Sequence, residues 1–411
     1  MIIAVPIYWL TKGESSTDKS IIESRNLAAL RPAGAPNLQR GLNLISEGNF
    51  FEGIKLLIDL YTSTSFIQKF ETTTSDQFPF RMPIINFSKA LERKIINFTY
   101  GFIDDTIIPA DMTNGIYYDA ENNQLLQPVN LFNPDTRVLI DERIENYAEL
   151  IWNHPEQNFY LYYHQIIDDS EFHPMVKYFP EADKGQSIEY FEENLPEGLT
   201  LKKFLLNSMD DHLKYYYRTD LHWNVFGLLH AYEEIYDLLS IDYTDISPML
   251  EIKNIFTFPD IKFLGLMARL TFYPIDGDNF SVEVVDIPPH EMIWGGQLVE
   301  TNSRSVYFKD EYSRIPYVNH YNEFYGYPTD LIEYTFENQS DRNLLIFGSS
   351  YINSLEPLLA SHYKKTYCVD LRRDTDFSLS KFLEEHEVDD ILIVGDYKVA
   401  FQQNEYWFIE P

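Results

Sequence analysis

Two short segments of the sequence carry residue types suited to nucleophilic catalysis. In the first, Asp220 lies two residues before His222, directly ahead of a helical pattern. In the second, the apolar run "NLLIFGSSY" ends in Ser349 and Ser350. A serine hydroxyl is a weak nucleophile until a base takes its proton, and that base needs an acid to fix its tautomer. The two segments together supply a nucleophile, a base and an orienting acid.

Each segment also has a purely structural interpretation. Asp220 is compatible with a turn or capping residue, His222 with a structural imidazole, and Ser350 with a helix N-cap. Among the other histidines, His164 is the strongest rival base, because it follows a predicted buried strand. The only cysteine, Cys368, lies in "KTYCVDL", which indicates a buried and inert thiol.

Composition bounds the class of protein. The 411 residues are 45% hydrophobic and 16% aromatic, enough for one large folded domain or two of ordinary size. The formal net charge of −32 repels phosphate backbones and argues against binding to nucleic acid. The same charge argues against docking on an anionic membrane through a basic patch.

The sequence opens with the apolar run "MIIAVPIYWL". A membrane-spanning helix needs about 20 apolar residues, so this run is too short to span a bilayer. It also lacks the basic start and the small-residue cleavage site of a signal peptide. It is equally compatible with a buried strand and with the end of a signal-anchor whose beginning is missing. Only such an N-terminal anchor would associate this chain with a membrane.

Hydrophobic periodicity predicts the elements that must position the reactive residues. Helical spacing covers the ranges 40–66, 82–100, 139–152 and 186–214. Another helix follows Asn224, its predicted N-cap. Short strands and turns are expected over 113–136, a buried strand over 158–166, and a β-rich insertion over 243–335 with a hairpin around Asp276-Gly277-Asp278.

The last 70 residues give the clearest pattern. Strands "NLLIFGSSY", "KTYCVDL" and "DDILIVGD" alternate with helices predicted over 352–363 and 377–386. This alternation is typical of βαβ units and of a parallel sheet. Function gathers at the carboxyl ends of such strands, where Ser349 and Ser350 lie. The N–H groups that begin the following helix can stabilise an oxyanion.

Several segments, in order along the chain, resemble the bacterial DHHW proteins. They are "IIESRNLAAL" (21–30), "DQFPFR" (76–81), "YYRTDLHWN" (216–224) and the stretch 344–372, with "FYGYP" (324–328) similar to a Gly-Pro segment. DHHW proteins are related to the SGNH-like acetyltransferases that O-acetylate exported polysaccharides such as alginate. The chain departs from the pattern at Leu221, where the motif has histidine, and at Ser349, where aspartate is usual.

The resemblance implies an α/β fold with a flavodoxin-like SGNH hydrolase core around a parallel sheet. It implies an N-terminal helical segment (1–100) packed on a catalytic domain (101–411), with the insertion at about 243–335. Carried over by position, Ser350 is the nucleophile, in preference to Ser349, with His222 as base and Asp220 as orienter. The residues expected at the oxyanion or substrate side are Ser349, Tyr351, Gly326, Tyr217 and Trp223, with the N–H of Gly326 as an oxyanion donor.

The function implied is a serine-dependent acyltransferase or esterase. It would act through an acyl-enzyme on O-acetyl groups of an exported bacterial cell-envelope glycan, outside the cytoplasm, with a membrane-bound acyltransferase as a partner. Whether water or a sugar hydroxyl accepts the acyl group stays open. The alternative is a catalytically inactive glycan-binding or assembly protein. No cofactor is expected. No metal is expected either, because the pairs Asp104-Asp105 and Asp168-Asp169 lack the spacing of a calcium loop and are predicted to be solvated turns.

Overall fold

The computed structural model describes residues 89–90, 92–98, 106–111, 114–241, 246–299, 307–309, 314, 317–327, 330–337, 340–373, 377–401 and 409–410. The chain divides into the units Met1–Lys94 and Ile95–Pro411, and the fold below is that of the second unit. The opening apolar run, the helix predicted over 40–66 and the segments 21–30 and 76–81 lie outside the described residues, as does Asp104-Asp105. The packing expected of an N-terminal segment 1–100 stays a prediction.

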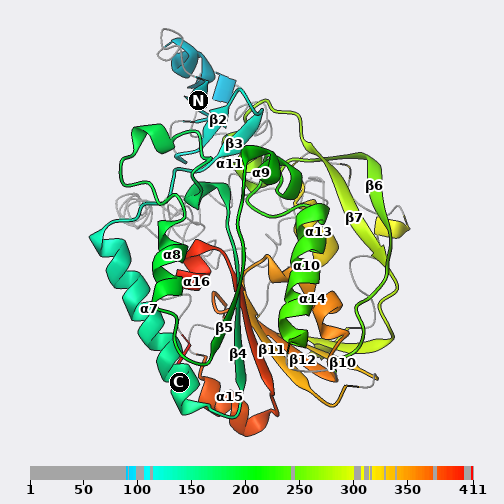
Figure 1. The fold of residues 1–411 in the computed structure, drawn as a ribbon. Helices are drawn as coiled ribbons and strands as arrows, with labels where there is room; N and C mark the ends of the chain where they lie inside the picture. Colours follow the sequence, from blue (N-terminus) through cyan, green and yellow to red (C-terminus); the bar gives the residue numbers. More distant parts are fainter. Residues whose placement is uncertain are drawn as a thin grey trace, which may run out of the picture. The chain divides into compact units, whose positions relative to one another are not determined.

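A mixed sheet of eight strands forms the centre of the unit (Figure 1). Its spatial order is β5-β4-β13-β11-β12-β10-β8-β9. The first five strands are parallel, and β10, β8 and β9 continue the sheet in antiparallel pairs. The strands are β4 (Asn158–His164), β5 (Leu199–Phe204), β8 (His290–Trp294), β9 (Gln297–Leu298), β10 (Leu331–Phe336), β11 (Asn343–Gly348), β12 (Lys365–Val369) and β13 (Asp390–Gly395).

The parallel strands do not follow a flavodoxin-like order when they are counted from the N-terminus. Counted that way, the five strands read 2-1-5-3-4 in space, whereas flavodoxin-like sheets read 2-1-3-4-5. The order becomes 2-1-3-4-5 when the count starts at β11, runs through β12 and β13, and resumes at β4 and β5. The last strand of the chain, β13, therefore lies between β4 and β11.

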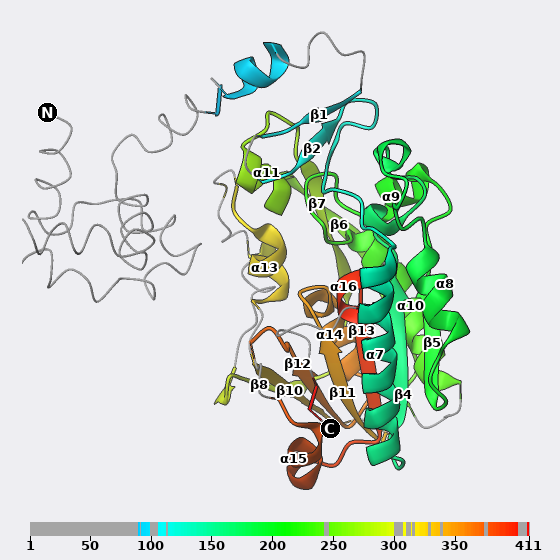
Figure 2. The same cartoon turned by 90° about the vertical axis from the view of Figure 1, so that its left-hand side faces the viewer.

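Helices cover both faces of this sheet (Figures 1 and 2). Alternate residues of each strand point to opposite faces, so the sheet contributes side chains to two separate apolar clusters. One cluster packs against α10 (Val225–Ser240) and α14 (Ile352–Ala360). The other packs against α7 (Pro134–Asn153), α8 (Gln186–Glu193), α15 (Leu379–Glu385) and α16 (Tyr397–Phe401). The mixed α/β class predicted from the sequence is confirmed.

Most predicted elements are present, and two predictions are wrong. The helical range 186–214 contains α8 and α9 (Met209–Tyr215), but the parallel strand β5 lies between them. In the insertion, β6 (Ile252–Phe263) pairs antiparallel with β7 (Asp278–Val285), so a hairpin exists. Its first arm lies upstream of the predicted one, because residues 268–271 belong to helix α11 (Leu266–Thr271) instead.

The remaining elements lie outside the main sheet. A three-stranded antiparallel sheet contains β1 (Ile107–Pro109), β2 (Tyr117–Asp119) and β3 (Gln124–Leu126). Helix α13 (His320–Tyr325) precedes β10, and two 3-10 turns follow β4 at Ile167–Asp169 and Val176–Tyr178. Helices α11 and α13 bear on the site, because each contributes groups that hold the reactive residues.

Candidate active site

The nucleophile candidate lies in the turn between β11 and α14. Gly348 ends the strand, and a Cβ added there would overlap the side chain of Ile352 and lie 3.2 Å from the carbonyl oxygen of Val394. Glycine therefore allows a sharp turn against the neighbouring strand. The N–H of Ile352 donates to the carbonyl oxygen of Ser349 at 3.0 Å, which closes the turn around Ser350. The hydroxyl of Ser350 is thus presented at the carboxyl end of the sheet, at the start of a helix.

The structure brings Ser350, His222 and Asp220 into one hydrogen-bonded chain. The Oγ atom of Ser350 lies 2.6 Å from Nε2 of His222. The Nδ1 atom of the same ring lies 2.5 Å from Oδ1 of Asp220. A carboxylate can only accept, so Nδ1 carries a proton that it donates to Asp220, and Nε2 is left to accept from the serine hydroxyl. This is the arrangement that a serine nucleophile requires.

The carboxyl group of Asp220 is held in its charged form. Burial on its own raises the pKa of Asp220, since only 1% of its side chain is exposed. The charge of His222, its hydrogen bond, the charge of Arg269 and the N–H of Leu266 act in the other direction and lower that pKa to about 2. Asp220 is therefore ionised at neutral pH and fixes the tautomer of the imidazole.

A clamp from the insertion fixes this carboxylate, and sequence reasoning missed it. The N–H of Leu266 donates to Oδ2 of Asp220, and the N–H of Gly265 donates to Oγ1 of Thr219 at 3.0 Å. A Cβ on Gly265 would overlap the side chain of Asp220. Glycine is therefore needed for this close approach, and no local pattern around residue 265 announces the contact with residue 220.

A second group of contacts joins the base to the nucleophile helix through the buried Ser354. The indole Nε1 of Trp223 and the phenol of Tyr321 each donate to Oγ of Ser354 at 3.0 Å. The ring of Tyr321 also stacks on His222, with ring centroids 4.3 Å apart. Its hydroxyl lies 3.3 Å from the carbonyl oxygen of Ser350, to which it also donates. Trp223 was predicted at the site, whereas Tyr321 and Ser354 were not.

Two of the other predicted residues pack behind the reactive atoms. The hydroxyl of Tyr351 donates to the carbonyl oxygen of Leu221 at 2.8 Å, so it ties the nucleophile turn to the acid–base segment. Tyr217 is buried, and its ring contacts that of Phe263 from β6 at 4.6 Å. Both side chains therefore hold the segment that carries His222.

Two predicted residues at the oxyanion side are placed differently from expectation. The N–H of Gly326 donates to the carbonyl oxygen of Asn322 at 2.8 Å and so ends helix α13. That N–H is therefore not available to an oxyanion, which corrects the expectation from the sequence. Ser349 is buried, with 8% of its surface exposed, and its carbonyl serves the turn before α14. Of the two serines, Ser350 is the one whose hydroxyl meets His222.

The rival histidine lies close to the site but in a different setting. His164 is fully buried between the rings of Trp223 and Tyr351, at centroid distances of 4.9 and 4.3 Å. Burial, with the nearby charge of His222, lowers the pKa of His164 to about 3. It is therefore neutral at pH 7 and acts as a packing residue. Cys368 is buried in β12, as predicted, and burial raises the pKa of its thiol.

The acidic pair Asp168-Asp169 is not a solvated turn, which corrects the expectation. Both residues are buried, and burial raises the pKa of Asp168 to about 7. The carboxylate of Asp169 accepts from the phenol of Tyr163 and from the N–H of Ile166. Within the described ranges, no group of three or more His, Cys, Asp or Glu side chains is arranged to hold a metal ion.

Comparisons with known proteins agree on the fold. No protein-family model matches the sequence, and no curated protein sequence matches it. The structure of Bacillus cereus PatB1 with a sulfonyl adduct aligns with a TM-score of 0.54 and 16% identity, over 72% of this chain and 98% of that one. A DHHW family protein from Eubacterium siraeum aligns with a TM-score of 0.53 and 16% identity, over 72% and 94% of the two chains.

The likeness is one of fold, at low sequence identity. At 16% identity, two chains can share a backbone arrangement while their surfaces and substrates differ. Among the helices that the structure describes, none is both long and apolar enough to cross a membrane. The relationship to DHHW proteins predicted from the sequence is thus confirmed as a structural one: this chain has the fold of PatB1 and of the Eubacterium siraeum DHHW family protein.

Proposed function

We propose that the protein is a serine-dependent acyltransferase or esterase that acts on O-acetyl groups of an exported bacterial glycan. The single observation that carries this proposal is the hydrogen-bonded chain from Ser350 through His222 to Asp220. A buried structural histidine has no need of an ionised acid on one nitrogen and an accessible serine on the other. We also propose that the core is SGNH-like and flavodoxin-like. Its five parallel strands match the flavodoxin-like order 2-1-3-4-5 when they are counted from β11.

In the first half-reaction, Oγ of Ser350 attacks the carbonyl carbon of the ester while its proton passes to Nε2 of His222. We expect backbone N–H groups of the turn between β11 and α14, other than that of Ile352, to stabilise the negative charge that forms on the carbonyl oxygen. The bond from that carbon to the sugar oxygen then breaks, and His222 gives its proton to the departing oxygen. Asp220 stays ionised throughout and stabilises the imidazolium.

The second half-reaction restores the serine. An acceptor hydroxyl loses its proton to His222 and attacks the acyl carbon of the acyl-enzyme, and the bond to Ser350 breaks as Oγ recovers that proton. Water as acceptor makes the protein an esterase, and a sugar hydroxyl makes it a transferase. Support for a reactive nucleophile also comes from the fold relative PatB1, which was captured with a sulfonyl adduct. A place outside the cytoplasm and a membrane-bound acyltransferase as partner belong to the same proposal.

Labelling with a fluorophosphonate probe tests the proposal directly. We expect covalent labelling of the wild-type protein, no labelling of Ser350→Ala, and undiminished labelling of the matched variant Ser349→Ala. We expect the labelling rate of the Asp220→Asn variant to be about 10⁴-fold lower than that of the wild type, because an amide favours the wrong imidazole tautomer. Wild-type protein that is folded but silent to the probe would overturn the proposal and leave a glycan-binding protein without turnover.

A further inference from the structure

The hairpin predicted around Asp276-Gly277-Asp278 contains a carboxylate that the mechanism above does not use. Asp278 begins β7, next to the end of β6. Alternate residues of a strand point to the same face, so Asp278 shares a face with Phe280 and Val282. Both of these side chains are buried in the apolar cluster to which Tyr321 of the site belongs. A carboxylate on such a face is costly unless it is hydrogen-bonded, so its bonds indicate its role.

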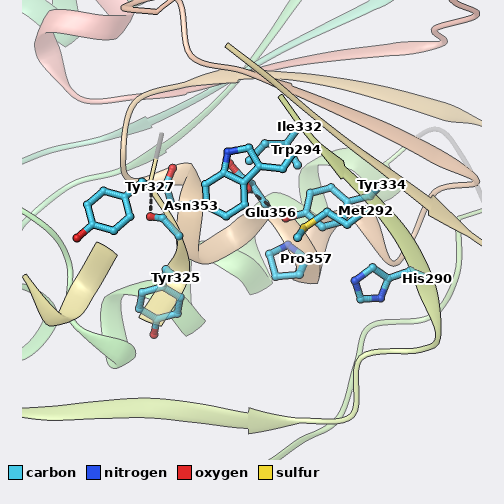
Figure 3. A pocket seen from close by; sticks show the side chains of 11 residues that line it. His290, Met292, Trp294, Tyr325, Tyr327, Ile332, Tyr334, Asn353, Glu356 and Pro357 are labelled. Atoms are coloured by element: carbon cyan, nitrogen blue, oxygen red, sulfur yellow. Dashed lines mark hydrogen bonds between the residues drawn. The ribbon is translucent and has the colours of Figure 1, made fainter. Parts of the chain in front are cut away.

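Strand β7 is fixed against helix α13. The phenol of Tyr325 on this helix donates to Oε2 of Glu283 in β7 at 2.9 Å. The same tyrosine lines the pocket beside α14 (Figure 3). The ring of Phe280 contacts that of Phe324 on the same helix, with ring centroids 6.0 Å apart. A side chain on β7 is therefore carried by a packed strand, as a positioning residue requires.

The carboxylate of Asp278 holds two groups of the acid–base segment, residues 217–223. Its Oδ2 atom accepts from the N–H of Arg218 at 3.0 Å and from the hydroxyl of Thr219 at 3.2 Å. Burial raises the pKa of Asp278 to about 6, although these two bonds act in the other direction. The group is therefore mainly ionised at neutral pH, where a carboxylate can only accept.

Thr219 connects Asp278 to the clamp on Asp220. Thr219 is fully buried, and its Oγ1 accepts from the N–H of Gly265 at 3.0 Å. Its single hydroxyl proton has two acceptors within reach, a backbone carbonyl oxygen at 3.3 Å and Oδ2 of Asp278. A charged acceptor forms the stronger bond, so Asp278 fixes the direction of the hydroxyl and leaves a lone pair for Gly265. The next N–H of the chain, that of Leu266, then meets Asp220.

We infer that Asp278 is a positioning residue for the pair of Asp220 and His222. By holding Arg218 and Thr219, its Oδ2 atom sets the register in which the backbone at 265–266 meets Asp220. The inference rests on the proposed function for the reaction that this pair serves. The role requires an acceptor atom at the place of Oδ2. An amide oxygen can therefore replace it, whereas a carboxylate moved by one methylene cannot.

Three variants of Asp278 separate the position of the acceptor from its charge. Asp278→Ala removes the acceptor, Asp278→Glu moves it by one methylene, and Asp278→Asn keeps an oxygen in its place without the charge. We expect fluorophosphonate labelling to slow about tenfold or more in the first two variants and to stay within about threefold of wild type in the third. The matched control is Asp286→Ala, which removes an exposed ion pair with Lys253 just beyond the other end of β7. It should label at the wild-type rate.

A proton resonance of the acid–base pair gives a readout that does not depend on turnover. The proton that Nδ1 of His222 donates to Asp220 lies in a charge-assisted hydrogen bond, so its NMR signal is expected far downfield. We expect Asp278→Ala and Asp278→Glu to shift this signal upfield. Asp278→Asn and the control Asp286→Ala should leave it in place. Urea unfolding of each variant, in parallel, measures the stability that the substitution costs.

Two results would overturn the positioning role. One is an Asp278→Ala protein that loses stability but keeps the wild-type labelling rate and the wild-type signal, because Asp278 would then serve the fold alone. The other is an Asp278→Asn protein as slow as Asp278→Ala, because the charge would then matter in place of the acceptor position. If Asp278→Ala does not fold, the remaining two variants decide the question, and equal rates in Asp278→Glu and Asp278→Asn overturn the role.

The same measurements keep this inference apart from the proposed function. If the folded wild-type protein is not labelled, the proposed enzyme is overturned. An upfield shift of the signal in Asp278→Glu, absent in Asp278→Asn, would still support the positioning of Asp220 and His222. Conversely, a labelled wild-type protein whose rate and signal are the same in all three variants supports the enzyme and overturns the role of Asp278.

Discussion

The nucleophile segment (348–354) and the acid–base segment (217–223) face each other but are held in different ways. The first is fixed by local geometry, because a buried parallel strand, a glycine and a helix follow one another within a dozen residues. In the second, an isolated antiparallel β-bridge pairs Tyr216 with Trp223. Contacts from distant parts of the chain hold the rest of the segment. Its clamp comes from residues 265–266 and its packing from β6.

This difference shows where the site is vulnerable. A nucleophile at a strand–helix turn is positioned as soon as the sheet forms, because backbone geometry places it. The base depends on an insertion that contributes no reacting atom. Changes that leave the nucleophile segment intact but loosen the insertion are therefore expected to lower activity while the fold is kept.

Among the variants that test this comparison, Gly265→Ala is expected to have the largest effect. The added methyl group overlaps Asp220, so the carboxylate must shift away from His222. A displacement of about 1 Å costs about 100-fold in rate, and we expect that fall in the rate constant for fluorophosphonate labelling. Gly115→Ala is the matched control, since its φ of +66° strains the backbone by about 1 kcal/mol away from the site. Equal rates for the two variants would show that the clamp does not position Asp220.

A smaller effect is expected from Ser354→Ala, which acts on both segments at once. Its hydroxyl accepts from Trp223 and Tyr321. Removing it takes the acceptor from the buried indole N–H of Trp223 and leaves Tyr321 with only the longer bond to the carbonyl oxygen of Ser350. We expect a loss of about 1–3 kcal/mol in the free energy of unfolding, measured in urea, with roughly tenfold slower labelling. Ser361→Ala, at the C-cap of the same helix, removes a hydroxyl that donates to the carbonyl of Leu358. It should cost less stability and leave the labelling rate unchanged, and a matching loss in both variants would contradict the bridging role.

The smallest effect concerns the pH dependence of stability through His164. Its pKa is about 3 in the folded protein and 6.5 in the unfolded chain, so the unfolded state binds more protons between these values. Stability is then fully present above about pH 6.5 and is lost as the pH falls toward 3. Between pH 7.5 and 5 this group accounts for a loss of about 2 kcal/mol.

His164→Phe should remove that loss. We expect its free energy of unfolding to decline less steeply than that of the wild type over this range, and the comparison at pH 7.5 isolates the packing cost of the substitution. An identical slope in the two proteins would mean that His164 is not the neutral, buried group described above.

The elements of the C-terminal region could be predicted from the sequence because their signals are local. Apolar runs define β11, β12 and β13, and glycine ends the first and the last of them. The N-cap Asn224 defines the start of α10 through its bonds to Phe226 and Gly227. The pairing of His222 with Asp220 could also be predicted, since both lie on one short segment. What could not be predicted is set by contacts across many residues.

The contribution of Gly265 illustrates this limit. Its need for a small side chain arises from Asp220, 45 residues earlier, and a single glycine after a strand gives no sign of it. Tyr321 reaches His222 from a helix about 100 residues later, within an aromatic-rich stretch in which no local signal distinguishes the ring that meets the imidazole. Strand β5 was missed for a related reason: it is half-exposed, so its pattern resembles the helices on either side.

The place of β13 in the sheet has a consequence for how the protein comes into being. The strand before the base, β5, belongs to the β5-β4 half, and the nucleophile follows β11 in the other half. Within the sheet, the two halves are joined by β13, which follows the other seven strands of this sheet in the sequence. A nascent chain that already contains all three reactive residues therefore still lacks the strand that brings them together. We expect the hydrogen-bonded chain from Ser350 to Asp220 to be complete only after Asp390–Gly395 has been synthesised and has inserted between β4 and β11.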